Sequence, residues 1–504
     1  MGEGWLGEST NSKGFRRQHI GLLLGPIGFI LVWALPGGEG LSPEGQRVAA
    51  IALLMATWWI TEAIPIPATA LLPVVLFPLL GVTDAGRTAA NYAHDLIFLF
   101  LGGFWIAVTL ERWELHRRIA LHTIRLVGSS PRRIVLGFMV ATAVLSMWLS
   151  NTATTMMMLP IGLAVLKRMS PESTVGDPDN PTHSPFGMAL MLGIAYAASI
   201  GGVATLIGTP PNAVLAGVLE KLYGYQITFA AWFAFGLPLS VVMLLLAWWY
   251  LTRLSFTRLP RDSAAGHEPV HAELERLGPL SYQEKGVLVV FVAVALAWIG
   301  RGLIAVPGLE MVRDSTIAIA GALALFLIPS RQPCGGGLLN WATAVAIPWD
   351  IILLFGGGFA LADGFAGSGL AEWIASQLSV LSGAGWVLVI ATVALLTLFL
   401  TEVTSNTATA TMLLPIVASI AVAAGIHPLG PMVAAALAAS FAFMLPVATP
   451  PNAVVFASRC ISIAKMARAG IWLNLLGFAL ITLFVTSVLP RLWALDLSAV
   501  PIDW

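Results

Sequence analysis

Two copies of the sequence Ser-Asn-Thr-Ala-Thr lie in the middle of long apolar stretches, where polar groups are costly. They begin at Ser150 and Ser405, within the segments 148–162 and 403–417. Ser, Asn and Thr favour the first positions of helices, where free N–H groups and the positive end of the helix dipole can face an anion. Hydroxyl, amide and carbonyl oxygens suit a hard cation such as Na⁺. Each motif therefore offers an edge for a carboxylate and a cage for a cation.

The two motifs belong to an internal repeat. They lie 255 residues apart (405 − 150), and the similar segments 94–107 and 349–362 have the same offset. A third pair, 208–217 and 448–457, carries Thr-Pro-Pro-Asn in both copies. Paired prolines cannot continue a helix, so they free nearby carbonyl groups as ligands. Three similar pairs in the same order predict a duplicated chain with two equivalent half-sites.

The composition is that of a polytopic membrane protein. Of the 504 residues, 58% are hydrophobic and 10% are charged, and the mean hydropathy is +0.85. Soluble domains carry about 25% charged residues. The net charge of +0 gives no indication of a nucleic-acid partner, and two cysteines, Cys334 and Cys460, provide no disulfide framework. The polar start, 1–17, lacks a cleavage pattern, so 20–35 is expected to be a retained span.

We expect all-α architecture with about eleven membrane crossings and two re-entrant hairpins. The predicted spans are 20–35, 48–64, 68–80, 96–110, 187–207, 229–251, 286–299, 315–328, 351–370, 432–446 with a continuation past 452, and 471–489. The stretches 134–166 and 386–426 do not fit this scheme, because 134–166 as one helix would be about 50 Å long. Splitting them at Ser-Asn-Thr predicts hairpins that enter and leave on one side; a kinked spanning helix is the alternative.

The basic residues predict the orientation. They cluster at 13–17, 112–133, 167–168 and 253–261, whereas 362–385 contains none. By the positive-inside rule, the N-terminus is expected in the cytoplasm and the C-terminus outside an inner (plasma) membrane. Five crossings in each repeat would invert the second copy relative to the first. Inverted repeats with interrupted helices are typical of secondary transporters, whose binding site lies near the membrane midplane.

Charge is almost absent from the predicted hairpins. The first contains no charged residue, and the second contains Glu402, aligned with Met147. Glu402 is expected either to face a dimer or scaffold surface or to tune a cation site. Because neither hairpin holds Lys or Arg, a multiply charged anion bound there would need its compensating charge from cations. This absence predicts Na⁺ coupling.

Together these motifs resemble the divalent anion/sodium symporter family, whose members carry dicarboxylates, citrate or sulfate. The likeness covers nearly the whole chain, including the segment 58–73. The family's C-terminal signature is matched at Ser440, Phe443, Pro446, Val447, Ala448, Asn452, Val454 and Val455.

The resemblance implies a set of binding residues. The first sodium site would comprise Ser146, Ser150, Asn151 and Gly208, and the second Thr401, Thr404, Asn406 and Ala448. Ser146 and Thr401 each lie four residues before their Ser-Asn-Thr motif, which supports the pairing. The substrate carboxylates would meet Asn151, Thr152, Thr209, Pro210, Asn406, Thr407, Thr449 and Pro450. No organic cofactor is expected.

The resemblance also implies a homodimer in which a transport domain moves like an elevator against a fixed scaffold. The expected division is 1–18 as a cytoplasmic tail, 19–130 and 286–384 as scaffold, 131–252 and 385–504 as transport domain, and 253–285 as a cytoplasmic linker. The leading hypothesis is Na⁺-coupled uptake of C4-dicarboxylates such as succinate, malate and fumarate.

Three alternatives remain from the residues alone. The same frame could carry sulfate or citrate, or it could exchange dicarboxylates without sodium. Exchangers are thought to replace the cation with a basic residue, and none lies beside these motifs. An intramembrane enzyme or a sensor is disfavoured, because the sequence shows no nucleophile–base pair and no HExxH or GxSxG motif.

Overall fold

The computed structural model describes residues 8–36, 38–128, 130–169, 184–257, 268–303, 311–332, 335–378, 383 and 385–501. Within these ranges the chain is helical apart from turns and one isolated β-bridge, between Pro329 and Gly337. The all-α prediction is therefore confirmed for the part of the chain that is described. Cys334 lies outside it, and Cys460 is buried with a free thiol.

The first half of the chain runs from α1 to α12. Its helices are α1 (Glu8–Ala34), α2 (Pro43–Thr61), α3 (Ile66–Thr69), α4 (Leu72–Leu79), α5 (Ala85–Ala90), α6 (Asp95–Arg112), α7 (Leu115–Val127), α8 (Pro131–Ser146), α9 (Asn151–Met169), α10 (Pro185–Gly202), α11 (Pro210–Tyr223) and α12 (Phe229–Trp249). A π-helical turn, η2 (Tyr250–Ser255), continues α12.

The second half runs from α13 to α24. Its helices are α13 (Glu268–Leu277), α14 (Tyr282–Leu303), α15 (Asp314–Leu327), α16 (Trp341–Ala344), α17 (Trp349–Ser368), α18 (Leu370–Gln377), α19 (Trp386–Thr401), α20 (Asn406–Ala423), α21 (Leu429–Ser440), α22 (Pro450–Ala457), α23 (Ile463–Ser487) and α24 (Leu489–Trp493).

Proline opens several of these helices. Pro43, Pro131, Pro185, Pro210 and Pro450 each occupy the first helical position. A proline costs little there, because the N–H it lacks would have no partner inside the helix. The Thr-Pro-Pro-Asn motifs therefore start helices α11 and α22 at equivalent places in the two halves.

The helix boundaries reproduce the sequence repeat. Helices α8 and α19 both have 16 residues. They begin 255 residues apart (386 − 131) and end 255 residues apart (401 − 146), and α9 and α20 also begin at this offset (406 − 151). Both Ser-Asn-Thr motifs thus interrupt the helical structure where the sequence predicted a break.

Eight helical segments of the described chain are long and apolar enough to cross a membrane, and four more are apolar but shorter. The shorter ones include the segments predicted as spans at 68–80, 315–328 and 432–446, which form Ile66–Leu79, Asp314–Leu327 and Leu429–Ser440. The segment at 432–446 stops being helical after Ser440, which is earlier than we predicted. The total of eleven crossings remains a prediction.

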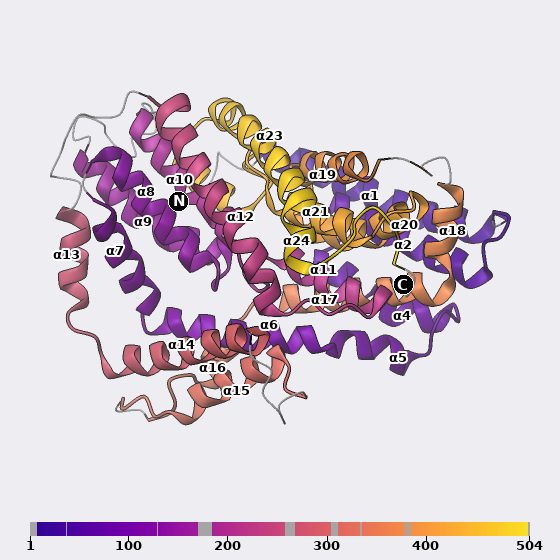
Figure 1. Cartoon of the computed structure of the whole chain (residues 1–504), viewed down its shortest axis with the longest axis horizontal. Coiled ribbons are helices and arrows are strands. Elements are labelled where there is room, and N and C mark those ends of the chain that lie inside the picture. The colour runs from indigo at the N-terminus through magenta and orange to yellow at the C-terminus, as the bar shows by residue number, and fades with distance from the viewer. Residues whose placement is uncertain are drawn as a thin grey trace.

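The two halves interlock. Helix α8 packs on α10, and its counterpart α19 packs on α21. Across the halves, α9 packs on α22 and α20 packs on α11. In Figure 1, α8–α10 lie near one end of the long axis and α18 and α20 near the other, with α11, α12 and α23 between them. Helices α6, α14 and α15 pack together along one edge.

Candidate functional site

The first half-site is built where α8 ends and α9 begins. The hydroxyl of Ser146, the last residue of α8, lies 2.6 Å from Asn151 Oδ1 and 2.7 Å from the carbonyl oxygen of Ala198 in α10. A serine hydroxyl has one proton, so it cannot donate to both oxygens at once. The Ser146 hydroxyl, Asn151 Oδ1 and the Ala198 carbonyl therefore bring three oxygens together with a single hydroxyl proton between them. The lone pairs that remain favour a cation.

The backbone around Gly208 comes close to this cluster. A Cβ placed on Gly202 would lie 2.7 Å from Asn151 Oδ1 and 2.9 Å from the Gly208 carbonyl oxygen. Gly202 therefore leaves space that brings the amide and the carbonyl together. The Ser150 hydroxyl instead accepts the N–H of Ala153 at 3.2 Å, which caps the start of α9. Of the predicted first sodium set, Ser146, Asn151 and Gly208 gather, and the Ser150 side chain serves the helix.

The second half-site repeats this geometry with threonine in place of serine. Thr401 Oγ1 lies 2.7 Å from Asn406 Oδ1 and 2.9 Å from the carbonyl oxygen of Ala439 in α21. Ser146 and Thr401 are both fully buried. The Thr404 hydroxyl does not join this cluster, because it bonds to the Leu400 carbonyl at 2.8 Å and to Thr409 at 2.6 Å.

The asparagines of the Thr-Pro-Pro-Asn motifs shape the non-helical segments 203–209 and 441–449. Asn212 Nδ2 donates to the carbonyls of Val203 and Thr205, at 3.3 and 2.8 Å. Asn452 Nδ2 donates to those of Ala442 and Leu445, at 3.1 and 3.0 Å. These segments carry Gly208 and Ala448, so each asparagine holds the backbone of its own half-site.

Two threonines stand at the starts of α11 and α22. Thr209 and Thr449 are buried, and Thr209 Oγ1 lies 3.4 Å from Ser440 Oγ of the other half. The Thr449 hydroxyl accepts the N–H of Asn452 at 3.4 Å. Pro210 and Pro450 follow as the first helical residues. The Thr209–Ser440 contact links the halves next to Ala439, whose carbonyl belongs to the second oxygen cluster.

The Ser-Asn-Thr tips are accessible, whereas the hydroxyls behind them are not. Asn151, Thr152, Asn406 and Thr407 are half-buried in the same pattern in both halves. The free N–H groups at the starts of α9 and α20 lie at these tips. The described residues contain no group of three or more His, Cys, Asp or Glu side chains that could hold a metal ion. Any cation here would therefore be held by neutral oxygens.

Glu402 has a role that the sequence left open. Its carboxylate accepts the backbone N–H groups of Phe443, Met444 and Leu445 at 2.8, 3.0 and 3.1 Å. Asn474 of α23 adds a fourth bond, from Nδ2, at 2.7 Å. Glu402 is 3% exposed, and donors of the interrupted segment and of α23 satisfy its buried carboxyl group. Glu402 thus holds the non-helical segment that leads to Ala448.

Sequence reasoning missed two members of this arrangement. Asn474 lies on an apolar helix, and an isolated amide in such a helix was a signal that it had a buried partner. The second is Thr205, a residue of the interrupted segment 203–209 itself, whose hydroxyl donates to the Met147 carbonyl at 2.5 Å. Met147 and Glu402 therefore occupy aligned positions and both fix the interrupted segment of their own half.

Comparison with known proteins decides the family. The family model described as "Sodium:sulfate symporter transmembrane region" matches residues 16–494, which is nearly the whole chain. The chain belongs to the divalent anion/sodium symporter family. The resemblance seen in the motifs is thereby confirmed.

Two curated relatives of this symporter-family chain come from staphylococci. It is 45% identical over 484 residues to the sodium-dependent dicarboxylate transporter SdcS of Staphylococcus saprophyticus, covering 95% of this chain and 93% of the relative. It is also 45% identical over 498 residues to SdcS of Staphylococcus aureus, covering 98% and 96%. As a family member the chain is a multi-pass membrane transporter and not an enzyme, as we predicted.

Solved structures of other transporters share the fold at low sequence identity. The Alcanivorax borkumensis YdaH transporter aligns with a TM-score of 0.56 and 13% identity, covering 87% of this chain and 98% of that one. Neisseria gonorrhoeae MtrF aligns with a TM-score of 0.55 and 14% identity, covering 89% and 96%. At such identities the likeness concerns the fold alone.

Proposed function

We propose that this protein is a Na⁺-coupled symporter that imports C4-dicarboxylates. The observation that carries the proposal is the pair of oxygen clusters, Ser146–Asn151–Ala198 and Thr401–Asn406–Ala439, which recur with nearly the same distances. The relatives named as sodium-dependent dicarboxylate transporters support the same cation and the same class of anion.

Each oxygen cluster is proposed to bind one Na⁺. The first site would use Ser146, Asn151 and Gly208 with the main chain of Ser150, whose hydroxyl caps α9. The second would use Thr401, Asn406 and Ala448 with the main chain of Thr404, whose hydroxyl bonds to Leu400 and Thr409. Hydroxyl, amide and carbonyl oxygens are ligands suited to a hard cation. To bind the ion, the Ser146 and Thr401 hydroxyls must point their protons away from it. The carbonyl oxygens of Ala198 and Ala439 can accept these protons.

The two carboxylates of the substrate are proposed to meet the helix starts beside these ions. Asn151, Thr152, Asn406 and Thr407 offer amide, hydroxyl and backbone donors. Thr209-Pro210 and Thr449-Pro450 complete the pocket. Because the stretches 134–166 and 386–426 contain no Lys or Arg, the bound cations supply the positive charge that a divalent anion requires. Binding of anion and cation is therefore coupled through their mutual attraction.

Alternating access is proposed to follow from the inverted repeat. Helix α7 packs on α8, whereas its repeat counterpart α18 packs on α20. Helix α17 packs closely on α11 and α20. The equivalent helices thus hold unequal positions, which is what one state of a two-state exchange would show. We propose that 131–252 and 385–504 move as the transport domain against 19–130 and 286–384, with both hairpins re-entrant.

The proposed assembly is a homodimer in the plasma membrane with the N-terminus in the cytoplasm. The scaffold segments receive some support from a buried ion pair, because Arg118 of α7 binds Glu284 of α14 at 2.6 Å. Glu284 lies at the end of the predicted linker 253–285, and α14 continues from it into the second predicted scaffold part, so the pair ties the start of that helix to the first part.

Uptake into liposomes tests the proposal. Purified protein should accumulate labelled succinate against its gradient when Na⁺ is high outside, and choline should not replace Na⁺. Equal uptake in choline would refute sodium coupling, and a need for internal dicarboxylate would identify an exchanger. Competition by unlabelled fumarate and malate, with little effect of sulfate or citrate, is the result expected for C4 specificity. Strong inhibition by sulfate or citrate would reassign the substrate.

A further inference from the structure

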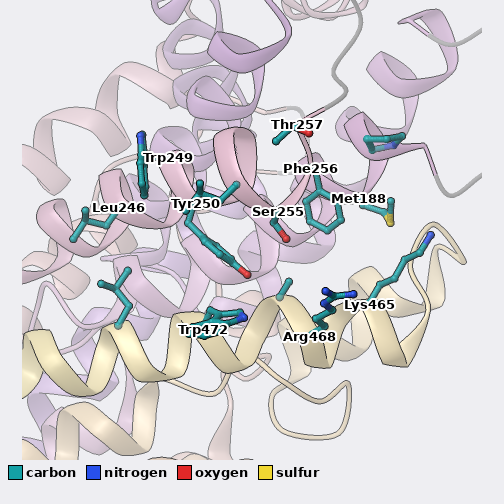
Figure 2. A pocket seen from close by; sticks show the side chains of 14 residues that line it. Met188, Leu246, Trp249, Tyr250, Ser255, Phe256, Thr257, Lys465, Arg468 and Trp472 are labelled. Carbon is teal, nitrogen blue, oxygen red and sulfur yellow. The ribbon is translucent and has the colours of Figure 1, made fainter.

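A large groove lies away from the oxygen clusters, between the end of α12 and the start of α23. It has a volume of about 870 Å³. One wall is formed by Trp249, Tyr250 and Ser255, and the other by Arg468 and Trp472. Figure 2 shows the Tyr250 and Ser255 hydroxyls turned toward α23 and the Arg468 guanidinium turned toward α12. None of the predicted sodium or substrate residues lines it.

The positive charge in this groove lacks compensation. Lys465 and Arg468 are exposed side chains in the first two turns of α23, at the positive end of the helix dipole. The first turn has no acidic residue, and Ser462 makes no side-chain cap. Neither cation forms an ion pair with any carboxylate that the structure describes. An anion seated here would satisfy both side chains and the free N–H groups beneath them.

The rest of the groove is apolar and faces outward. Trp249, Leu254 and Trp472 are 48, 58 and 60% exposed. Leu246 and Leu476 extend the lining along α12 and α23. Tryptophan and tyrosine concentrate where headgroups meet hydrocarbon, because their rings are apolar and their tips are polar. Basic groups at one end and exposed apolar side chains at the other match an amphiphile that carries negative charge.

The wall on the α12 side is locally irregular. The chain forms a π-helical turn at Tyr250–Ser255, where α-helical bonding would otherwise continue. Such turns occur frequently at functional sites. This turn contributes three of the lining residues, Tyr250, Leu254 and Ser255. It brings two hydroxyl donors to the wall opposite Arg468.

We propose that this groove binds an anionic phospholipid. Its phosphate lies between Lys465, Arg468 and the hydroxyls of Tyr250 and Ser255, and its acyl chains follow the apolar side chains of α12 and α23. Because α12 and α23 belong to different repeats, the lipid bridges the two halves. This site uses none of the residues of the proposed transport function, so either proposal can fail without the other.

Native mass spectrometry of the full-length protein in detergent tests the site. Phosphatidylglycerol and phosphatidylcholine with matched acyl chains are titrated against the wild type, Lys465→Gln/Arg468→Gln and a control, Arg253→Gln/Lys285→Gln. The control removes the same charge from exposed residues that do not line the groove. Each basic residue near an anionic lipid strengthens its binding. Because Lys465→Gln/Arg468→Gln removes two of them, this variant should bind phosphatidylglycerol at least about tenfold more weakly.

The expected result is a preference for phosphatidylglycerol in the wild type and the control, lost in Lys465→Gln/Arg468→Gln. Excess glycerol 3-phosphate should not displace the lipid, because it has no acyl chain; displacement would indicate a site for soluble phosphate instead. Equal binding of both lipids by the wild type, or an undiminished preference in the double variant, would overturn the proposal. If that variant does not fold, Tyr250→Phe/Ser255→Ala provides the same comparison, with weaker phosphatidylglycerol binding expected.

Discussion

The smallest unit of the account is one hydroxyl between two oxygens. Ser146 and Thr401 each contact an asparagine Oδ1 and a helix carbonyl, and each is fully buried. Buried polar groups normally reach a complete hydrogen-bond match. Here each hydroxyl lies beside two acceptor oxygens but can donate its proton to one of them, so one acceptor oxygen lacks a donor in both copies. The surplus is the residue-scale reason to expect a cation at each place.

Removing either hydroxyl should weaken Na⁺ binding. We expect Ser146→Ala and Thr401→Ala each to raise the Na⁺ concentration for half-maximal succinate uptake by roughly tenfold, because one polar contact to a charged group contributes about 1.5–3 kcal/mol. Thr142→Ala is the matched control, since this buried hydroxyl of α8 bonds to the Phe138 carbonyl at 2.6 Å. An equal rise in the control would show that the effect is not specific to the cluster.

Glu402 should matter for stability. Glu402→Ala removes the acceptor of the Met444 and Leu445 N–H groups and of Asn474 Nδ2, whereas the Phe443 N–H keeps Asn474 Oδ1 at 3.2 Å. Each lost bond costs about 1–3 kcal/mol, so the free energy of unfolding should fall by several kcal/mol. Glu402→Gln keeps one acceptor oxygen, so its free energy of unfolding should lie between those of the wild type and Glu402→Ala. Thermal unfolding in detergent measures the order, with Glu372→Ala, an exposed carboxylate, as the control. A Glu402→Ala protein as stable as the wild type would contradict the assigned role.

At the residue scale, the sequence predicted the positions but not all the contacts. Ser146 and Thr401 could be paired because the repeat aligns them. The Glu402–Asn474 bond could not be predicted from the sequence, because it joins residues 72 positions apart through the packing of α23. Side-chain partners at that separation depend on tertiary structure that no local pattern encodes.

The element scale is set by interrupted helices. Breaks after α8 and α19 follow from N-cap residues inside long apolar stretches, so the sequence was sufficient to predict them. The end of α21 at Ser440 was not predictable in this way. Its following N–H groups are taken by Glu402, a tertiary acceptor that ends the helix earlier than the apolar pattern indicates.

The close approach at Gly208 gives an element-scale prediction. A Cβ there would clash with the Gly202 carbonyl, which is backbone and cannot rotate away. Gly208→Ala should therefore displace the segment 203–209 and reduce Na⁺-driven succinate uptake at least tenfold, with the protein still in the membrane. Gly300→Ala is the control, because a Cβ on Gly300 meets no atom within 4 Å. Normal uptake by Gly208→Ala would show that the position of this segment does not limit Na⁺ binding.

At the scale of the whole molecule, the two repeats pack against each other. Helix α9 packs on α22 and α20 packs on α11, so the helix that follows each Ser-Asn-Thr motif contacts a helix of the other repeat. The duplication was readable from matching segments, but this exchange of partners was not. It depends on packing between surfaces that are apolar on every side and carry no distinguishing pattern.

A cross-link between α17 and α20 tests the proposed movement. A Cβ on Gly358 would lie 3.6 Å from Thr411 Cβ, within the range for a disulfide. In a Cys334→Ser/Cys460→Ser background, Gly358→Cys/Thr411→Cys should cross-link on oxidation and lose uptake, and reduction should restore it. The single cysteine variants should be insensitive to oxidant. Full uptake by the cross-linked protein would contradict movement of 385–504 against 286–384.

The most direct measurement of the central claim is the simultaneous influx of labelled Na⁺ and labelled succinate into liposomes. Twin cation sites that accompany one dicarboxylate predict at least two Na⁺ for each succinate, with both fluxes beginning together. Succinate entry without additional Na⁺ influx would contradict the account, because the anion would then cross without the cations that the two oxygen clusters are proposed to bind.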